Sequence, residues 1–312
     1  MGDEVHGGGV GAELPLVGAG GERVDLRRTL ASHGVASLPP QRLDEEAWTL
    51  ETTLPLGSGA RTVRMHESRP GFALVEPVGR TGRAQLDALV ATVRHMLRLD
   101  DDLSPFYARA VDDPELAWVT RGAGRMLRSP TVFEDVVKTI CTTNVAWGGT
   151  VRMVTALVEQ LGVPAPDGRR AFPSPAAMAE ADESFYREVA RAGYRGPYLR
   201  KLADDVASGA VDLEALSDPE LPEDEVAARL LALPGVGPYA AAHILTTALG
   251  RYRRLIFDSW TRPTYARLNG RKASDRTIER RFRRYGEFAG LAFWLYLTRG
   301  WVSTAELSDS TP

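Results

Sequence analysis

The strongest constraint on the fold is a helical spacing of apolar residues that starts near Ser104 and continues almost to the end of the chain. Apolar side chains recur there at steps of three and four, and glycine or proline interrupts the pattern only briefly. Such a segment has to bury its apolar stripes by packing helix against helix. The C-terminal two-thirds is therefore predicted to be all-α, with helices at 133–161, 175–192, 195–208, 222–231, 238–249, 260–268, 275–285 and 288–301.

The region before this helical part has a different pattern. Residues 62–65 and 72–75 are short apolar segments separated by glycine and proline, and they predict antiparallel strands. An apolar stripe from Leu86 to Leu97 predicts a helix that ends near Leu99 and covers the strands. Residues 1–21 contain eight glycines and are expected to form a flexible tail. The expected fold is mainly α, or α+β overall, with a small antiparallel-β N-terminal domain.

The composition limits the class of protein. With 312 residues and 44% hydrophobic residues the chain can bury a full core. Its apolar runs are too short for a membrane helix and its start lacks the features of a signal peptide, so we expect a cytoplasmic protein. One cysteine, Cys141, allows neither an internal disulfide nor a cysteine-ligated zinc or iron–sulfur site.

The charge is unevenly distributed. The whole chain carries −3, but residues 251–284 hold twelve basic and three acidic residues, a net +9 that leaves −12 for the rest. A cationic segment on an acidic chain is typical of a surface that binds nucleic acid. A solvated arginine-rich helix would give the same count, so the cluster alone leaves both interpretations open.

The most specific local motif is the segment Leu-Pro-Gly-Val-Gly-Pro-Tyr at 233–239. Gly235 and Gly237 join two predicted helices, and Pro238 suits the first turn of the second one. Without side chains at the two glycines, free N–H groups at the helix start can approach an anion such as a DNA phosphate. An ordinary tight turn between helices is the alternative.

About twenty residues further on, Asp258 lies between an apolar pair and the start of a helix. It could simply be a helix N-cap. The same place also suits a carboxylate that stays ionised, because the N-terminal end of a helix stabilises negative charge.

Taken together, residues 233–249 followed by 258–268 resemble the helix-hairpin-helix and Gly/Pro/Asp signature of the HhH-GPD DNA glycosylases. Residues 121–162 resemble the 8-oxoguanine branch, and 193–198 and 290–295 resemble bacterial inducible 3-methyladenine enzymes. The resemblance implies two helical subdomains and a small β domain, with a tail at 1–21, the β domain at 22–100, a helical domain at 101–250 ending in the hairpin, and C-terminal helices at 251–312 that complete the second subdomain with 101–130.

The resemblance also implies a reaction. The enzyme would bind double-stranded DNA as a monomer in a bacterial cytoplasm, flip a damaged base and cut its N-glycosidic bond with Asp258. Bifunctional members carry a lysine two residues after the second hairpin glycine, where this chain has Tyr239. We therefore expect a monofunctional enzyme without AP-lyase activity, acting on an alkylated or bulky purine.

The remaining site residues follow from the same resemblance. The base pocket is expected to contain Tyr239, His243, Trp260, Phe293 and Trp147. His243 and Phe293 replace the cysteine and glutamine of the 8-oxoguanine branch, and His243 or Tyr239 could equally be a core residue. No cofactor is required, although the family holds a monovalent cation, K⁺ or Na⁺, on hairpin carbonyls. The DNA contacts are expected from Asn144, Gly235, Val236, Gly237, Tyr239 and Arg262, and the cation ligands from the carbonyls of Leu231, Leu233 and Val236.

Three alternatives remain at this level. An oxidised-purine glycosylase is supported by residues 121–162 and opposed by Tyr239, His243 and Phe293. A non-catalytic DNA-binding protein would keep the hairpin and the basic segment only for recognition of DNA structure. A self-protection enzyme that excises adducts of a natural product would use the same machinery as a repair enzyme.

Overall fold

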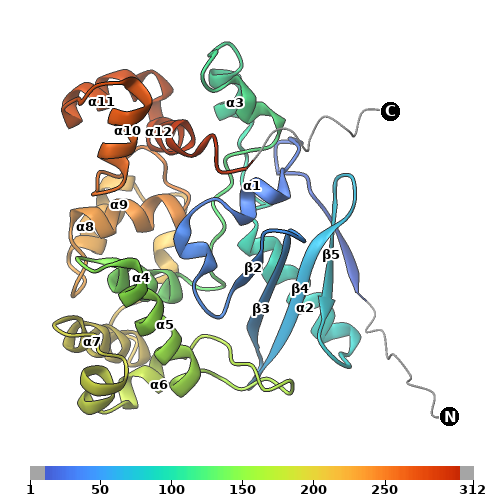
Figure 1. The fold of residues 1–312 in the computed structure, drawn as a ribbon. Helices are drawn as coiled ribbons and strands as arrows, with labels where there is room; N and C mark the ends of the chain where they lie inside the picture. Colours follow the sequence, from blue (N-terminus) through green and yellow to red (C-terminus); the bar gives the residue numbers. More distant parts are fainter. Residues whose placement is uncertain (1–10, 303–312) are drawn as a thin grey trace.

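The structure, a computed structural model, describes residues 11–302. A five-stranded sheet lies on one side and a larger body of helices on the other (Figure 1). The predicted fold class, mainly α with a small antiparallel sheet, is confirmed. In the described part of the chain, the helices are too short or too polar to cross a bilayer.

The sheet is antiparallel throughout, with the strand order β1-β5-β4-β3-β2. Two tight turns join its longest strands, and each uses a glycine with a left-handed backbone, Gly57 at φ 60° and Gly71 at φ 80°. The strands are β1 (Ala12–Pro15), β2 (Arg42–Asp44), β3 (Thr49–Leu56), β4 (Gly59–Arg69) and β5 (Phe72–Pro77).

Helix α2 (Arg83–Met96) covers one face of this sheet. Its buried residues Leu89 and Val93 belong to the same apolar cluster as Leu50, Val63 and Val75 on the three long strands. The stripe recognised in the sequence is therefore the face that buries the sheet.

The predicted tail is wrong for the residues that the structure describes. β1 pairs with β5 along its whole length, and Leu14 and Leu16 are buried in the sheet cluster. The high glycine content of this segment led to the prediction of a tail. The alternating residues Leu14 and Leu16 nevertheless supply enough apolar surface for the segment to pack on the sheet. Residues 1–10 lie outside the described part of the chain.

The helical body contains two apolar clusters. One combines the helices between 132 and 248, and the other combines residues 103–126 with the C-terminal helices. The elements are α1 (Leu26–Leu30), η1 (Gly34–Ser37), α3 (Ser104–Ala110), η2 (Ala117–Arg121), α4 (Val132–Thr142), α5 (Trp147–Leu161), α6 (Pro175–Glu180), η3 (Phe185–Val189), α7 (Arg195–Ala207), η4 (Glu214–Ser217), α8 (Glu223–Leu231), α9 (Pro238–Thr247), α10 (Thr261–Asn269), α11 (Asp275–Phe282), η5 (Arg283–Phe288) and α12 (Ala289–Thr298).

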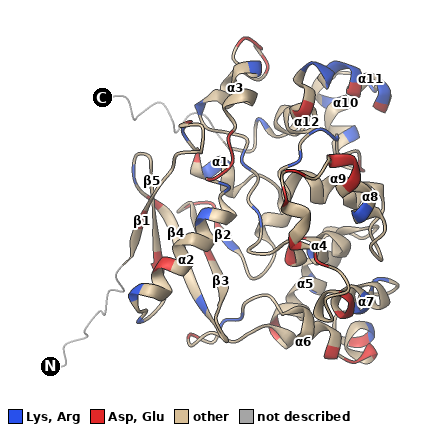
Figure 2. Ribbon diagram, turned by 180° about the vertical axis from the view of Figure 1, so that it is seen from behind, with Lys and Arg blue, Asp and Glu red and all other residues tan. Residues whose placement is uncertain are grey.

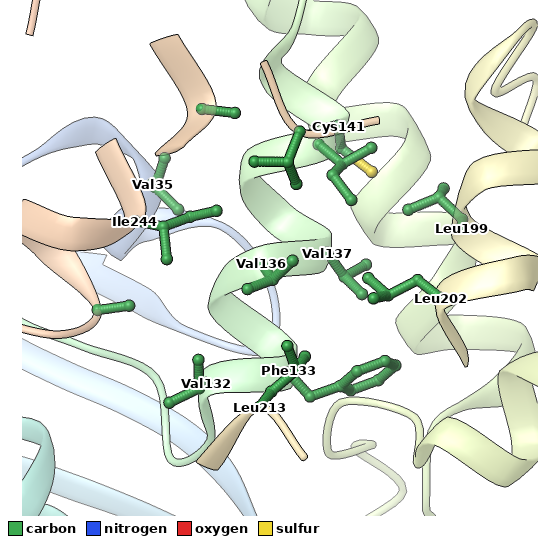
Figure 3. Packing of buried hydrophobic residues seen from close by; sticks show 14 of the residues in the cluster. Val35, Val132, Phe133, Val136, Val137, Cys141, Leu199, Leu202, Leu213 and Ile244 are labelled. Atoms are coloured by element: carbon green, nitrogen blue, oxygen red, sulfur yellow. The ribbon is translucent and has the colours of Figure 1, made fainter. Parts of the chain in front are cut away.

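Helix α4 is the centre of the first cluster and is buried around its circumference. Figure 3 shows Val136 and Val137 of α4 pointing in different directions, toward Ile244 of α9 and toward Leu202 of α7. A helix enclosed in this way fixes the position of α9, which carries the second half of the hairpin.

One predicted helix, 133–161, is two helices in the structure. The break falls at residues 143–146, where Thr143 is extended and Asn144 has a φ of 46°. Asparagine tolerates this left-handed backbone better than most residues. The break turns the end of α4 outward and leaves Asn144 exposed beside the hairpin region.

Arg98 ties the small domain to the hairpin helix. Its buried guanidinium donates to the carbonyl of Met126 at 2.9 Å and to that of Thr247, the last residue of α9, at 2.7 Å. Asp101 pairs with the same group at 3.1 Å. A cation at this end also suits the dipole of α9.

Candidate active site at the helical hairpin

The hairpin joins α8 to α9 through residues 232–237. Gly235 has a φ of 81°, and a Cβ there would lie 3.1 Å from the Tyr198 ring and 3.3 Å from Ile140. Gly237 has an ordinary φ of −97°, and a Cβ there would meet nothing within 4 Å. Gly235 is thus required by backbone conformation and packing, whereas Gly237 leaves an open surface.

The N–H groups at this turn differ in availability. Val236 donates its N–H to the Leu233 carbonyl at 3.2 Å, and its side chain is buried. In residues 11–302 the N–H groups of Gly235, Gly237 and Tyr239 have no acceptor. The N–H groups left for an anion are therefore those of the two glycines and Tyr239, whereas Val236, also expected to contact DNA, uses its N–H within the turn and buries its side chain.

Asp258 lies half-buried just before α10. Its Oδ1 accepts from the N–H of Trp260 at 2.8 Å and from that of Thr261 at 2.6 Å, and its own N–H donates to Thr261 Oγ1 at 2.9 Å. The side chain is thus an N-terminal cap, as one reading of the sequence proposed. Oδ2 has no donor within the described residues, so one carboxylate oxygen stays available.

Tyr239 and His243, one turn apart on α9, form an aromatic wall near Asp258. Their rings are 5.9 Å apart. Burial raises the pKa of Tyr239, opposed by the Thr142 side chain and reinforced by the charge of Asp258. Burial lowers the pKa of His243 to about 4 and Asp258 opposes this shift, so the imidazole is neutral at pH 7.

Two further predicted pocket residues border the same region. Trp260 contacts Trp294 with the rings tilted by 47° and their centroids 5.5 Å apart, and Trp294 donates its indole N–H to the Ser32 carbonyl at 2.8 Å. The exposed ring of Trp147 lies against Gly34, where a Cβ would be 3.4 Å from it. Residues 32–34 of the N-terminal part therefore connect the tryptophans to the histidine on α9.

Phe293 is not at this site. It has no exposed surface and packs on Phe257, Tyr265 and Phe282 in the second helical cluster. Its assignment to the base pocket is wrong, because the apolar face of α12 at this position points into the core.

An exposed aromatic pair that the sequence did not single out lies next to Asn144. Tyr194 and Tyr198 are 53% and 41% exposed, and Asn144 donates its amide to the Tyr194 hydroxyl at 3.2 Å. Arg195 binds the Thr143 carbonyl and its guanidinium lies 4.5 Å from the centre of the Tyr194 ring. The sequence could have indicated this pair, because two tyrosines lie four residues apart in the glycine- and proline-containing segment 193–198.

The basic segment is partly neutralised within the protein. Arg262, a predicted DNA contact, forms a two-point ion pair with Asp275 at 2.8 and 2.9 Å. Arg251 donates to the Asp218 and Leu221 carbonyls. Acidic side chains hold Arg253, Arg254, Arg281 and Arg284. Six cations of this segment have neither an ion pair nor a side-chain hydrogen bond in residues 11–302: Arg267, Arg271, Lys272, Arg276, Arg280 and Arg283.

These cations lie between residues 267 and 283, from α10 through α11 to the start of η5, and Figure 2 shows blue segments at α10 and α11. A cleft of about 840 Å³ separates α11 from the hairpin helices. Arg276, Arg280 and Arg283 line one wall, and Leu231 and Pro238, on either side of the hairpin turn, line the other. The arginines without an ion pair therefore lie across the cleft from the hairpin turn.

Solved structures of DNA glycosylases resemble this structure over nearly its whole length. The 3-methyladenine DNA-glycosylase from Archaeoglobus fulgidus is 22% identical at a TM-score of 0.71, with 94% of this chain and 99% of that chain covered. MBOgg1, solved with a low-affinity DNA ligand, is 19% identical at a TM-score of 0.71, with 96% and 99% covered. Clostridium acetobutylicum 8-oxoguanine glycosylase/lyase is 19% identical at a TM-score of 0.68, with 89% and 94% covered.

No protein-family model and no curated sequence matches the chain. The similarity is therefore one of three-dimensional structure, and in these two neighbours it covers 96% and 94% of this chain. The chain has the fold that these glycosylases share, as its resemblance to the helix-hairpin-helix signature predicted.

Proposed function

We propose that this chain is a monofunctional DNA glycosylase that hydrolyses the N-glycosidic bond of a flipped, damaged purine. The observation that carries the proposal is the position of Asp258, whose carboxylate has one oxygen without a donor among the described residues and whose charge acts on Tyr239 and His243 of the hairpin helix. The shared fold supports the general activity, because structural neighbours are named as 3-methyladenine and 8-oxoguanine glycosylases.

Asp258 would stabilise the positive charge that develops on the sugar as the bond to the base breaks. The bonds from Trp260 and Thr261 hold Oδ1, so Oδ2 is oriented without further reorganisation. A water molecule then adds to the sugar carbon, the base leaves with the bonding electrons, and the proton of the water is released. The products are a free base and an intact abasic site.

The lack of an amine at the hairpin supports hydrolysis without strand cleavage. The sequence contains three lysines, at 138, 201 and 272. Lys138 is buried in an ion pair with Glu134 at 2.7 Å, Lys201 pairs with Asp205 on α7, and Lys272 lies between α10 and α11. None of them is at position 239, where a Schiff-base lysine would be expected.

The base would be held by stacking. Tyr239 and Trp260 offer aromatic faces, and an electron-poor alkylated purine gains about 0.5–2 kcal/mol from such a contact. This favours alkylated or bulky purines. An 8-oxoguanine-type substrate is the second candidate, supported by the neighbours of that kind and by Asn144.

Duplex DNA would be gripped at the hairpin by the N–H groups of Gly235, Gly237 and Tyr239. The turn also fits the monovalent cation of the family in part. In residues 11–302 the carbonyls of Leu231 and Val236 accept no hydrogen bond, whereas that of Leu233 already accepts from Val236. Such an ion would add positive potential near a bound phosphate.

The test is excision from duplexes containing 7-methylguanine, 3-methyladenine or 8-oxoguanine, with Asp258→Asn as the variant. Asparagine keeps the oxygen that caps α10 and removes only the charge. We expect release of an alkylated base by the wild type, loss of turnover in the variant, and unchanged duplex affinity. The enzyme should leave the DNA strand unbroken, so that a strand break appears only after the reaction products are heated in alkali.

Unaltered excision by Asp258→Asn would remove that residue from the mechanism. Release of 8-oxoguanine alone would replace the alkylated substrate by the second candidate. Salt-sensitive duplex binding without excision of any lesion would instead identify a DNA-binding protein.

A further inference from the structure

Two histidines lie buried edge to face behind Tyr239. His33, in the loop before η1, and His243, on α9, are 4% and 5% exposed, and their ring centroids are 5.9 Å apart at an interplanar angle of 87°. They come from different subdomains. Their contact therefore brings the N-terminal loop against the hairpin helix.

Each ring has a buried nitrogen with no hydrogen-bond partner in the described part of the chain, Nδ1 of His33 and Nε2 of His243. The other nitrogen of His33, Nε2, lies 2.7 Å from the Leu127 carbonyl. Since a carbonyl only accepts, Nε2 carries the proton and Nδ1 is left as a bare acceptor.

Burying a polar atom without a hydrogen-bond partner costs stability. Two unpartnered nitrogens on neighbouring rings therefore call for a ligand that satisfies them. Both rings are neutral at pH 7, so each has one N–H donor and one acceptor nitrogen. Burial lowers the pKa of His33 to about 3, with further contributions from His243, Arg98 and Lys138, and burial also holds the pKa of His243 low.

The pair borders the candidate active site. His243 contacts Tyr239, and Asp258 is close enough to influence the pKa values of both residues. On the other side, Ser32 accepts from Trp294, and Gly34 touches Trp147. Both unpartnered nitrogens are closed off from solvent in the structure, so a base flipped toward Asp258 would reach them only when the rings or residues 32–34 move to admit its edge.

We propose that the His33–His243 pair reads the flipped base and selects purines whose edge carries an N–H donor, such as an exocyclic amino group. This inference rests on the proposed function and names the polar part of its substrate recognition. Nδ1 of His33 accepts the N–H of the base, and Nε2 of His243 accepts a second one in the neutral tautomer whose proton is on Nδ1. Both positions are filled only in the complex. Rings without charge suit a base that is itself electron-poor or cationic.

Leucine and glutamine variants of each histidine test the pair. Leucine removes the nitrogens and keeps an apolar side chain of similar size. Glutamine at position 33 can still donate to the Leu127 carbonyl with its amide and present its oxygen as the acceptor. For the lesion that the wild type excises best, we expect His33→Leu and His243→Leu to lower kcat/KM about 10- to 100-fold, and the glutamine variants to stay within about fivefold of wild type.

The substrate class is tested by affinity in the Asp258→Asn background, in which the base stays attached. The probes are duplexes with 3-deaza-3-methyladenine, which keeps its amino group, with 1,N6-ethenoadenine, in which that nitrogen has no N–H, and with a tetrahydrofuran abasic analogue. We expect the leucine variants to weaken binding of the first duplex alone, about tenfold or more.

The proposal is overturned if the leucine variants bind all three duplexes as the parent does, or lose affinity for all three equally, as a packing defect would. Thermal melting is the folding control, and we expect no loss of stability in His243→Leu because an unpaired nitrogen is removed. A wild type that excises no lesion would overturn the proposed function itself. If the wild type excises a lesion and the leucine variants do so equally well, only the proposal about the histidine pair is overturned.

Discussion

The two hairpin glycines serve different purposes although they are only two residues apart. Gly235 has a left-handed backbone and lies against Tyr198, so both strain and contact exclude a side chain. Gly237 has neither constraint, and its open side faces away from the protein. Stability and access to a phosphate are therefore assigned to separate residues.

We expect Gly235→Ala to lower the free energy of unfolding by about 1–3 kcal/mol, because a non-glycine residue is forced into a left-handed conformation. Gly237→Ala should leave stability nearly unchanged and weaken duplex affinity, since its methyl group occupies the space where a phosphate would approach. Urea denaturation and fluorescence anisotropy measure the two effects. Equal destabilisation by both substitutions would contradict this division.

Buried imidazoles set the dependence of stability on pH. His33, His243 and His95 all have lowered pKa values, at about 3, 4 and 4, because of burial. The unfolded chain binds protons near pH 6.5, so their contribution is complete above that pH and is lost as the pH falls toward 4. Asp135 acts oppositely, because burial raises its pKa to about 6 and its contribution is lost as the pH rises.

Three histidines outweigh Asp135 and Glu214, whose pKa burial also raises, so we predict that the free energy of unfolding falls between pH 7 and pH 5. The double variant His33→Leu/His243→Leu should show a flatter dependence, by up to roughly 1.4 kcal/mol per pH unit for each imidazole removed. Denaturation curves at pH 5, 6 and 7 measure the slopes. An identical slope in the double variant would show that these two rings are not buried in the neutral form.

At the scale of elements, α9 is held at both ends. Its start is the hairpin turn packed on Tyr198 and Ile140, and its last carbonyl is bound by the buried Arg98. Val136 of α4 packs on its middle. Tyr239 and His243 therefore stand on a helix with little freedom to move.

Replacing Arg98 by methionine should cost about 3–5 kcal/mol, because it leaves the Met126 and Thr247 carbonyls without their donor in a buried position. Arg94 forms an exposed ion pair with Asp100 and provides the matched control, for which a loss of at most about 1 kcal/mol is expected. Thermal or urea unfolding of the two variants measures both losses of stability. Similar losses would mean that Arg98 does not anchor α9.

At the scale of the whole molecule, the cationic segment has two populations. Arg253 and Arg254 are held by acidic residues of α8, whereas Arg276, Arg280 and Arg283 face the same cleft without an ion-pair partner in the described residues. Only unpaired cations release counterions from DNA phosphates without first losing an internal partner. The free charges next to the hairpin should therefore dominate duplex binding.

We expect the triple variant Arg276→Gln/Arg280→Gln/Arg283→Gln to reduce the slope of log affinity against log salt by about 2–3, at about 0.9 for each phosphate that is no longer neutralised. The double variant Arg253→Gln/Arg254→Gln should change the slope much less. Equilibrium binding to an undamaged duplex at salt concentrations from about 50 to about 200 mM gives both values. A larger effect of the paired arginines would place the DNA elsewhere.

Local features could be predicted from the sequence alone. Periodicity predicted the helices and the strands, and the glycine spacing predicted the hairpin. The order of the hairpin and Asp258 predicted a candidate site, which stays a prediction. These features depend on backbone propensity and side-chain spacing within about one element, which a sequence displays directly. The same signal failed at residues 11–21, where two leucines form a strand only because β5 lies beside them.

Which residues meet depended on the packing of the whole chain. That packing buried Phe293 in a cluster of aromatic rings, paired Arg262 with Asp275, and brought His33 to His243 across about two hundred positions of chain. A side chain can face the core, an ion-pair partner or the site, and the packing of elements distant in sequence decides which. The residue type alone does not reveal the outcome. A lone histidine before a glycine looks the same in either place, and only the fold made His33 part of the candidate site.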